Sequence, residues 1–243
     1  MKIIGIIPAR YNSSRFPGKP LVSICGIPMI KRTYLQAQQS HLLNDLMVAT
    51  DSQIIFDFCH KENIPVILTS SNHKTGTDRI AEVAKQIRAD LYINIQGDEP
   101  VIDPLNINLI VKSYQKWKDK YIAYNLYKTI TETNEINANS IIKVITNQND
   151  ELMYMSRFGI PYNKTDKIAT HKKQVCVYGF SAYSLDIFSS SSKTLNEYYE
   201  DIEILRFLDL GYKVKMEKTN LDSISVDTPD DIIKVENFIK TKA

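Results

Sequence analysis

The sequence predicts an α/β protein built on one mostly parallel sheet with helices on both faces. In the first half of the chain, short apolar runs alternate with amphipathic segments of about ten residues, a pattern typical of β-α-β units. The first run, Ile3-Ile4-Gly5-Ile6-Ile7, is apolar throughout, as in strands that are buried on both faces. In the second half, strand-like segments follow one another without full helices between them, which predicts antiparallel additions and a small flap or dimerisation lobe.

The first half should contain four strands and three helices in alternation. The apolar runs predict strands at residues 3–7, 46–49, 65–68 and 91–95, and the amphipathic segments predict helices at 29–39, 53–62 and 77–87. Right-handed crossover connections would then place helices over both faces of a parallel sheet.

The second half should contain strands, one long helix and a C-terminal helix. We expect strands at 121–130, 141–146, 152–155, 175–183 and 212–216, and a helix at 196–210 that Gly211 ends. A short strand should end at Asp227, just before a last helix with Thr228 as its N-cap. Without repeats or a linker, residues 1–243 should form a single domain.

Composition excludes several classes of protein. Of 243 residues, 30 are Lys or Arg and 28 are Asp or Glu, so the net charge is only +2. Proteins that coat nucleic acid or bind membrane surfaces need a stronger basic excess, so we expect neither partner. No apolar stretch approaches the ~18 residues of a membrane span. Three cysteines in an odd count, without close pairs, indicate structural thiols in a reducing cytoplasm.

A cationic loop follows the first predicted strand. Arg10, Arg15 and Lys19 lie within ten residues of one another, interleaved with Ser13, Ser14 and Gly18. Ligands of open α/β sheets bind beyond the carboxyl ends of the strands. Guanidinium groups, hydroxyls and exposed backbone N–H groups there can bind phosphate oxygens. The alternative is that these residues form a solvated basic turn without a ligand. Their position directly after a buried strand disfavours this interpretation.

Two aspartates could meet at the same edge of the sheet. Asp98 follows the predicted strand 91–95 in the turn Gln96-Gly97-Asp98-Glu99-Pro100, and Asp227 precedes the last helix. Carboxylates improve phosphate binding when a hard cation lies between them, and Mg²⁺ uses one or two carboxylates together with phosphate oxygens. Taken singly, each aspartate could instead be a turn or cap residue.

A polar loop, His73 to Arg79, leads into the helix predicted at 77–87. Helix N-termini bind anions well, whereas a cation in the first turn opposes the helix dipole, so Arg79 is a candidate ligand-binding residue. A salt-bridged surface arginine is the alternative.

Seven segments together resemble the cytidylyltransferases that activate 3-deoxy-manno-octulosonate (Kdo), the CMP-Kdo synthetases. They occur in the family's order and cover almost the whole chain: residues 7–21, 49–51, 73–83, 94–100, 154–161, 177–179 and 226–229. The loop from Arg10 to Pro20 and the turn from Gln96 to Pro100 are specific in combination, whereas either alone indicates only some nucleotidyltransferase.

The resemblance implies a Rossmann-like fold, a homodimer, and Mg²⁺-dependent transfer of CMP from CTP to a ulosonate sugar for lipopolysaccharide or capsule synthesis. By position, the triphosphate would be held by four residues of the loop: Arg10, Ser13, Arg15 and Lys19. Arg15 and Lys19 would also neutralise the leaving pyrophosphate, which makes them catalytic together with the metal ligands Asp98 and Asp227. The nucleotide or sugar would contact Thr77, Arg79 and Gln96.

The sugar pocket departs from the family pattern at two positions. Many members have Arg/Lys-His where this chain has Lys173-Gln174, and many have Glu-Gln-Leu-Arg where it has Glu203-Ile204-Leu205-Arg206. A site that hydrogen-bonds a hydroxyl discriminates strongly against ligands without one. The acceptor could therefore be Kdo, an amino-modified Kdo or another ulosonate.

The sequence is also compatible with three other functions. A nucleotidyltransferase for a sugar phosphate or alditol phosphate would share the cationic loop and Asp98. A metal-dependent glycosyltransferase would normally carry an Asp-x-Asp motif, which Asp98-Glu99 is not. A nucleotide-binding module without activity would not require Asp227 to reach Asp98.

Overall fold

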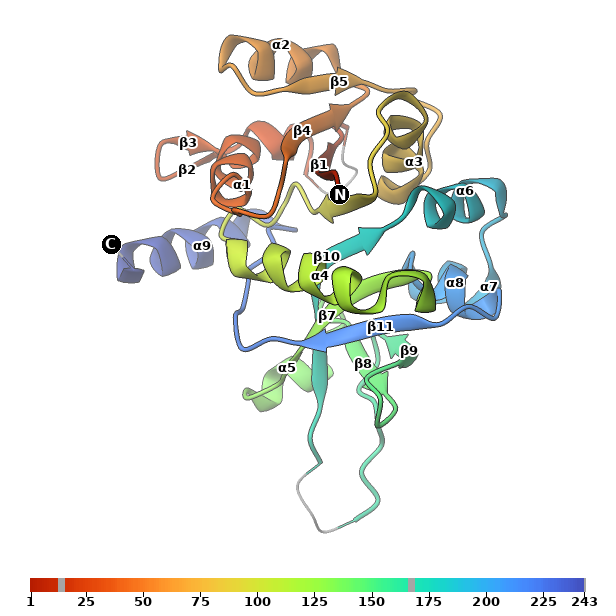
Figure 1. Cartoon of the computed structure of the whole chain (residues 1–243). Helices are drawn as coiled ribbons and strands as arrows, with labels where there is room; N and C mark the ends of the chain where they lie inside the picture. Colours follow the sequence, from red (N-terminus) through yellow and green to blue (C-terminus); the bar gives the residue numbers. More distant parts are fainter. Residues whose placement is uncertain (13–15, 166–168, 243) are drawn as a thin grey trace.

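The structure, a computed structural model, describes residues 1–12, 16–165 and 169–242. A sheet of nine strands runs through this part of the chain in the order β11-β7-β10-β6-β1-β4-β5, with β8 beside β10 and β9 beside β8. Helices lie against both faces of the sheet (Figure 1). The predicted α/β fold with a mostly parallel sheet is confirmed.

The first half follows the predicted alternation. Parallel strands β1 (Ile3–Ala9), β4 (Asp45–Thr50), β5 (Val66–Leu68) and β6 (Leu91–Ile95) alternate with helices α1 (Met29–Ala37), α2 (Gln53–Lys61) and α3 (Gly76–Gln86). Successive β1 side chains enter two different apolar clusters: Ile3 and Ile7 contribute to one, Ile4 and Ile6 to the other. Burial on both faces explains the unbroken apolar run in the sequence.

The second half adds strands in both directions. Strands β7 (Ala123–Thr129) and β11 (Val214–Lys218) are parallel to each other, and β10 (Lys172–Phe180) lies between β7 and β6, antiparallel to both. Strands β8 (Lys143–Thr146) and β9 (Leu152–Ser156) extend the sheet antiparallel from β10. The described residues 157–165, which follow β9, project from the body (Figure 1). The predicted antiparallel addition is thus confirmed.

Further helices flank these strands. The larger ones are α4 (Pro104–Trp117), α6 (Ala182–Ser190) and α9 (Pro229–Lys242). Shorter elements are the helix α5 (Thr133–Asn137), the 3₁₀ turns η1 (Lys19–Leu21) and η2 (Lys118–Lys120), and a hairpin of β2 (Ser23–Ile24) and β3 (Ile27–Pro28). Helix α4 was not predicted, although Asp103 caps it by accepting a hydrogen bond from the Leu105 N–H.

Three predictions about the second half are wrong in detail. The helix expected at 196–210 is two helices, α7 (Leu195–Glu200) and α8 (Leu205–Asp209), because Asp201 takes a left-handed conformation with φ 52°. Tyr183 belongs to α6 and not to a strand, since Ser181 and Ser184 form a capping box there. Residues 225–227 form no strand.

The C-terminal helix packs on the N-terminal hairpin. Val235 of α9 and Val226 are fully buried in a small apolar cluster with Ile24, Met29 and Val101. All three cysteines are free thiols, and Cys25 is exposed. None of the helices in the described ranges has the length and apolar character needed to cross a membrane.

Candidate functional site

Two aspartates from distant parts of the chain meet at one lysine. The Lys19 Nζ atom lies 2.7 Å from Asp98 Oδ2 and 3.6 Å from Asp227 Oδ1. It also donates a hydrogen bond of 2.9 Å to the Val226 carbonyl. The Asp98 and Asp227 side chains are 29% and 31% exposed, so both remain accessible to a ligand. The structure therefore brings together the two acids and one cation of the predicted site.

Asp98 is placed by the sheet. It follows β6 in a turn closed by a hydrogen bond from the Glu99 N–H to the Gln96 carbonyl. The turn passes so close to β1 that a Cβ atom on Gly97 would lie 2.9 Å from the Pro8 carbonyl oxygen. A glycine is therefore required at this point, and the carboxyl ends of β1 and β6 are held side by side.

Lys19 is placed by a tight loop. Gly18 has a φ of 71°, a left-handed conformation that favours glycine, and its N–H donates to the Tyr11 carbonyl over 3.0 Å. This bond returns the chain to the end of β1 and starts the 3₁₀ turn that carries Lys19. The predicted phosphate-binding residues Ser13 and Arg15 lie outside the described residues.

Asp227 is placed without a strand. The Val226 N–H donates to the Asp98 carbonyl over 2.9 Å, so a single backbone bond joins the C-terminal segment to the turn after β6. The Val226 side chain is fully buried and anchors the segment in the small apolar cluster. The missing strand therefore does not separate the two acids.

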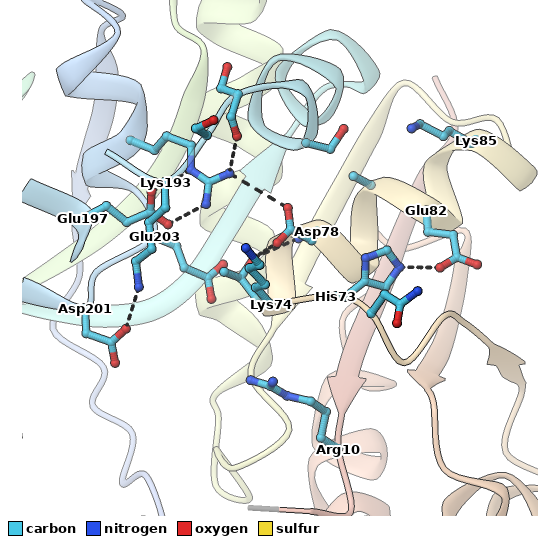
Figure 2. A pocket seen from close by; sticks show the side chains of 17 residues that line it. Arg10, His73, Lys74, Asp78, Glu82, Lys85, Lys193, Glu197, Asp201 and Glu203 are labelled. Atoms are coloured by element: carbon cyan, nitrogen blue, oxygen red, sulfur yellow. Dashed lines mark hydrogen bonds and ion pairs between the residues drawn. The ribbon is translucent and has the colours of Figure 1, made fainter. Parts of the chain in front are cut away.

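A cavity of about 510 Å³ opens beside these groups. Besides Lys19, Asp98 and Asp227, its lining includes Arg10, Gln96 and Arg79. A neighbouring cavity of about 700 Å³ shares Arg10, Asp201 and Glu203 with it and extends over Lys74 and Lys193 (Figure 2). A third, of about 150 Å³, is lined by Thr77, Asn94, Gln96, Tyr178 and Ile204, among others. These adjoining spaces suit an extended polar ligand.

Comparisons with known proteins place this chain in a family. A family model described as cytidylyltransferase matches residues 4–219. A 3-deoxy-manno-octulosonate cytidylyltransferase from Fusobacterium nucleatum is 39% identical, over 99% of this chain and 98% of that protein. One from Protochlamydia amoebophila is 38% identical, over 98% and 94%. The chain belongs to this cytidylyltransferase family.

Solved structures agree with the assignment. A CMP:2-keto-3-deoxy-manno-octonic acid synthetase complexed with CTP superposes with a TM-score of 0.93 at 32% identity and covers 100% of both chains. The inositol-1-phosphate CTP transferase from T. maritima, at 13% identity and a TM-score of 0.70, shares the fold alone. The family match therefore extends over the whole sheet.

Arg79 is more enclosed than the sequence suggested. Its side chain is buried and donates to the Thr69 hydroxyl, and its Nη2 atom lies 3.1 Å from Asp51 Oδ2. It lines the cavity of about 510 Å³ but already has an ion-pair partner. Arg79 thus forms a buried salt bridge and not the surface one given as the alternative, and this ion pair links α3 to the end of β4.

Glu203 was not among the predicted site residues, although it lines all three cavities. Its carboxylate accepts hydrogen bonds from the backbone N–H groups of Gly76 (3.3 Å) and Thr77 (3.0 Å), at the N-terminus of α3. Burial raises its pKa, and these hydrogen bonds oppose that shift. The sequence signal was the Glu-Ile-Leu-Arg segment. The position of Glu203, between α7 and α8 and beside the N-terminus of α3, is set only by tertiary packing.

Glu99 was also overlooked, although it directly follows Asp98. Its side chain is 4% exposed. Burial, reinforced by the negative charges of Asp98, Asp222 and Asp227, raises its pKa to about 8. Near neutral pH Glu99 is therefore largely protonated and does not act as a third anion beside Asp98.

The donor set fits a divalent cation that a substrate helps to hold. Within the described residues, no three or more His, Cys, Asp or Glu side chains form a group that could bind a metal alone. Asp98 and Asp227 provide two accessible carboxylates that converge on one point. Mg²⁺ commonly takes one or two carboxylates and completes its shell with water and phosphate oxygens.

Proposed function

We propose that this protein transfers CMP from CTP to the anomeric hydroxyl of 3-deoxy-manno-octulosonate, or of a closely related ulosonate, and releases pyrophosphate. The observation that carries the proposal is the meeting of Lys19, Asp98 and Asp227 at the carboxyl edge of the sheet. Membership in the 3-deoxy-manno-octulosonate cytidylyltransferase family supports the choice of nucleotide and sugar.

The reaction requires positioning and charge neutralisation more than a covalent protein group. The anomeric oxygen forms a bond to the α-phosphorus, the bond between that phosphorus and the β-phosphate oxygen breaks, and the hydroxyl proton passes to solvent. Lys19 and Arg10 lie where they can bind the triphosphate, and Lys19 would offset charge on the departing pyrophosphate. From the sequence, Ser13 and Arg15 would join them.

Asp98 and Asp227 would hold Mg²⁺ in the working enzyme. When bound, Mg²⁺ lowers the pKa of a coordinated hydroxyl and neutralises phosphate charge. The two carboxylates, which line the cavity, would hold this charge there, and the Lys19 ammonium group reduces their mutual repulsion. Thr77 and Gln96 line the adjoining small cavity, where nucleotide or sugar hydroxyls would bind.

The sugar end of the site is partly apolar. Ile204 lines the cavity of about 150 Å³ beside Tyr178 and Gln96. An isoleucine cannot hydrogen-bond a hydroxyl, so this wall selects the acceptor through shape. Kdo and an amino-modified Kdo are therefore both to be compared as acceptors.

The wider assignments are a role in lipopolysaccharide or capsule synthesis, a cytoplasmic location and a homodimer. Support for the dimer comes from large apolar side chains exposed at the antiparallel extension: Met153 is 59% exposed, Phe158 77% and Tyr162 86%. Such exposed groups are typical of surfaces that bind another protein. Light scattering on the purified protein measures this directly.

Pyrophosphate release tests the central proposal. Each of the four NTPs is incubated with Mg²⁺ and the enzyme, with and without Kdo, an amino-modified Kdo and other ulosonates. Release that requires CTP, a ulosonate and Mg²⁺ together supports the proposal. Release with a sugar 1-phosphate in place of the ulosonate would favour a different nucleotidyltransferase and contradict it.

A further inference from the structure

Asp227 depends on its immediate surroundings for its position. It lies between β11 and α9 on a segment without regular secondary structure. The Val226 backbone is held on one side by the Asp98 carbonyl and the Lys19 ammonium group. The bonds that hold Asp227 on its other side come from the first turn of α9.

Asp231 makes those bonds. Its Oδ2 atom accepts hydrogen bonds from the Asp227 N–H (3.1 Å), the Thr228 N–H (2.9 Å) and the Thr228 hydroxyl (2.9 Å). Its Oδ1 atom accepts from the Lys234 ammonium group over 2.7 Å. The Asp231 side chain is 16% exposed, whereas the neighbouring Asp230 is an exposed residue.

These contacts exceed what the helix needs for its own cap. In a capping box, the side chain three residues into the helix accepts a hydrogen bond from the N–H of the N-cap residue. Here Thr228 precedes the first helical residue, Pro229, so the bond to the Thr228 N–H meets that requirement. The bond to the Asp227 N–H reaches one residue further and fixes the peptide that carries the candidate metal ligand.

We propose that Asp231 is a positioning residue that holds the Asp227 carboxylate toward Asp98 and Lys19. The inference rests on the proposed function, in which Asp227 binds a divalent cation. Asp231 does not line the cavity beside Asp98 and Asp227. It acts through the backbone, so its loss should weaken cation binding while the fold and the cationic loop persist.

Binding of Mn²⁺ provides the test. Free Mn²⁺ is followed by electron paramagnetic resonance as the enzyme is titrated in the presence of CTP and without any sugar. For Asp231→Ala we expect affinity for Mn²⁺ to fall roughly 3- to 30-fold, the range set by the loss of a helix-terminal cap. In the steady state, the Mg²⁺ concentration for half-maximal turnover should rise by a similar factor, with little change in kcat at saturating Mg²⁺.

Three matched variants act as controls. Asp231→Asn keeps an oxygen that can accept from Asp227 and Thr228, so it should restore near-normal Mn²⁺ affinity. Asp230→Ala removes an acid from the same helical turn, and Lys234→Gln removes the ion pair to Asp231. Both should leave Mn²⁺ affinity unchanged. Equal weakening by Asp230→Ala would show a general charge effect and overturn the proposal.

A double-mutant cycle shows whether Asp231 acts through Asp227. In an Asp227→Asn background, Asp231→Ala should cause no further loss of Mn²⁺ affinity, and a full additional loss would contradict the mechanism. If Asp231→Ala lowers the helix content measured by circular dichroism, the Mn²⁺ titration is carried out on Asp231→Gln instead. Gln keeps an acceptor but displaces it by one CH₂ group, so unchanged Mn²⁺ affinity in that variant would also overturn the proposal.

The outcome is separable from that of the proposed function. The Mn²⁺ titration contains no sugar, so it reports on Asp231 even if no ulosonate supports pyrophosphate release. Normal release by the wild type together with unchanged Mn²⁺ affinity in Asp231→Ala would leave the reaction intact and reject the role of Asp231.

Discussion

Asp98 and Asp227 reach the same lysine by different structural means. Asp98 follows a central strand and lies on a turn packed against β1, where the Gly97 position leaves no space for a Cβ atom. Asp227 lies on irregular chain, held by one backbone bond to Asp98, by Lys19 and by Asp231. The first acid is fixed by many contacts shared across the sheet, and the second by a few specific bonds.

This difference separates what is robust in the site from what is sensitive. A strand buried on both faces resists local change, because its displacement disturbs two apolar clusters at once. A loop held by individual hydrogen bonds shifts when one of them is lost. Mutations near Asp98 should therefore affect stability, whereas mutations near Asp227 should affect cation binding and turnover.

The largest expected effect comes from the acids themselves. Asp98→Asn and Asp227→Asn should each lower turnover by orders of magnitude, roughly 100-fold or more, because each removes a negative charge that would hold the cation. Steady-state pyrophosphate release measures the loss, and circular dichroism should show an unchanged fold. Near-normal turnover in both variants would refute the assignment of Asp98 and Asp227 as metal ligands. The difference in how the two acids are held would then have no consequence for the reaction.

Lys19 joins the two regions, and its removal should have the next largest effect. Lys19→Ala takes away the ammonium group that contacts both acids and the Val226 carbonyl. We expect turnover to fall about 10- to 100-fold, with a raised KM for CTP, since triphosphate charge is less well neutralised. Lys19→Arg keeps the charge and serves as the control. Unchanged kinetics in Lys19→Ala would reduce the cationic loop to a structural element.

Gly97→Ala tests how rigidly the turn that carries Asp98 is held against β1. A Cβ atom there would lie 2.9 Å from the Pro8 carbonyl oxygen, so either β1 or the turn after β6 must shift. We expect a loss of about 1–3 kcal/mol in the free energy of unfolding, measured by urea denaturation. Gly76→Ala is the matched control, because its Cβ atom would make ordinary contacts at 3.5 Å or more. Equal losses in both variants would contradict the close approach of β1 and the Asp98 turn.

The last expected effect is a change in the pH dependence of stability through Glu99, which bears on the reaction only indirectly. Burial raises its pKa from 4.5 to about 8, so the folded protein binds this proton more tightly than the unfolded chain does. Its contribution to stability is fully present below pH 4.5, decreases as the pH rises toward 8, and levels off above that. The slope cannot exceed about 1.4 kcal/mol per pH unit for one proton.

Glu99→Gln should flatten this part of the curve, because Gln does not titrate. Urea denaturation at pH values between 5 and 9 gives the slopes for both proteins. An identical slope for wild type and Glu99→Gln would show that Glu99 is already ionised in the folded protein.

Local patterns predicted much of the fold and part of the site. The continuous apolar run of β1, the mainly apolar run of β6 and the spacing within α3 are set by neighbouring residues. The predictions for the parallel half therefore agree with the structure. The long helix expected at 196–210 failed at Asp201, where a single left-handed residue separates α7 from α8. Hydrophobic periodicity does not mark a left-handed residue. Asp201 is also not a glycine, the residue type that would have indicated a break.

Sequence patterns alone predict the α/β order, the cationic loop with Lys19, and Asp98 and Asp227 as candidate site residues, because strand burial and turn chemistry act over short distances along the chain. Tertiary packing sets which groups these residues contact. It placed Asp227 beside Lys19 without a strand, paired Arg79 with Asp51, and brought Glu203 to the junction of the cavities. These contacts join residues far apart in the chain, and they depend on how helices and loops pack at the sheet edge, which no local pattern encodes.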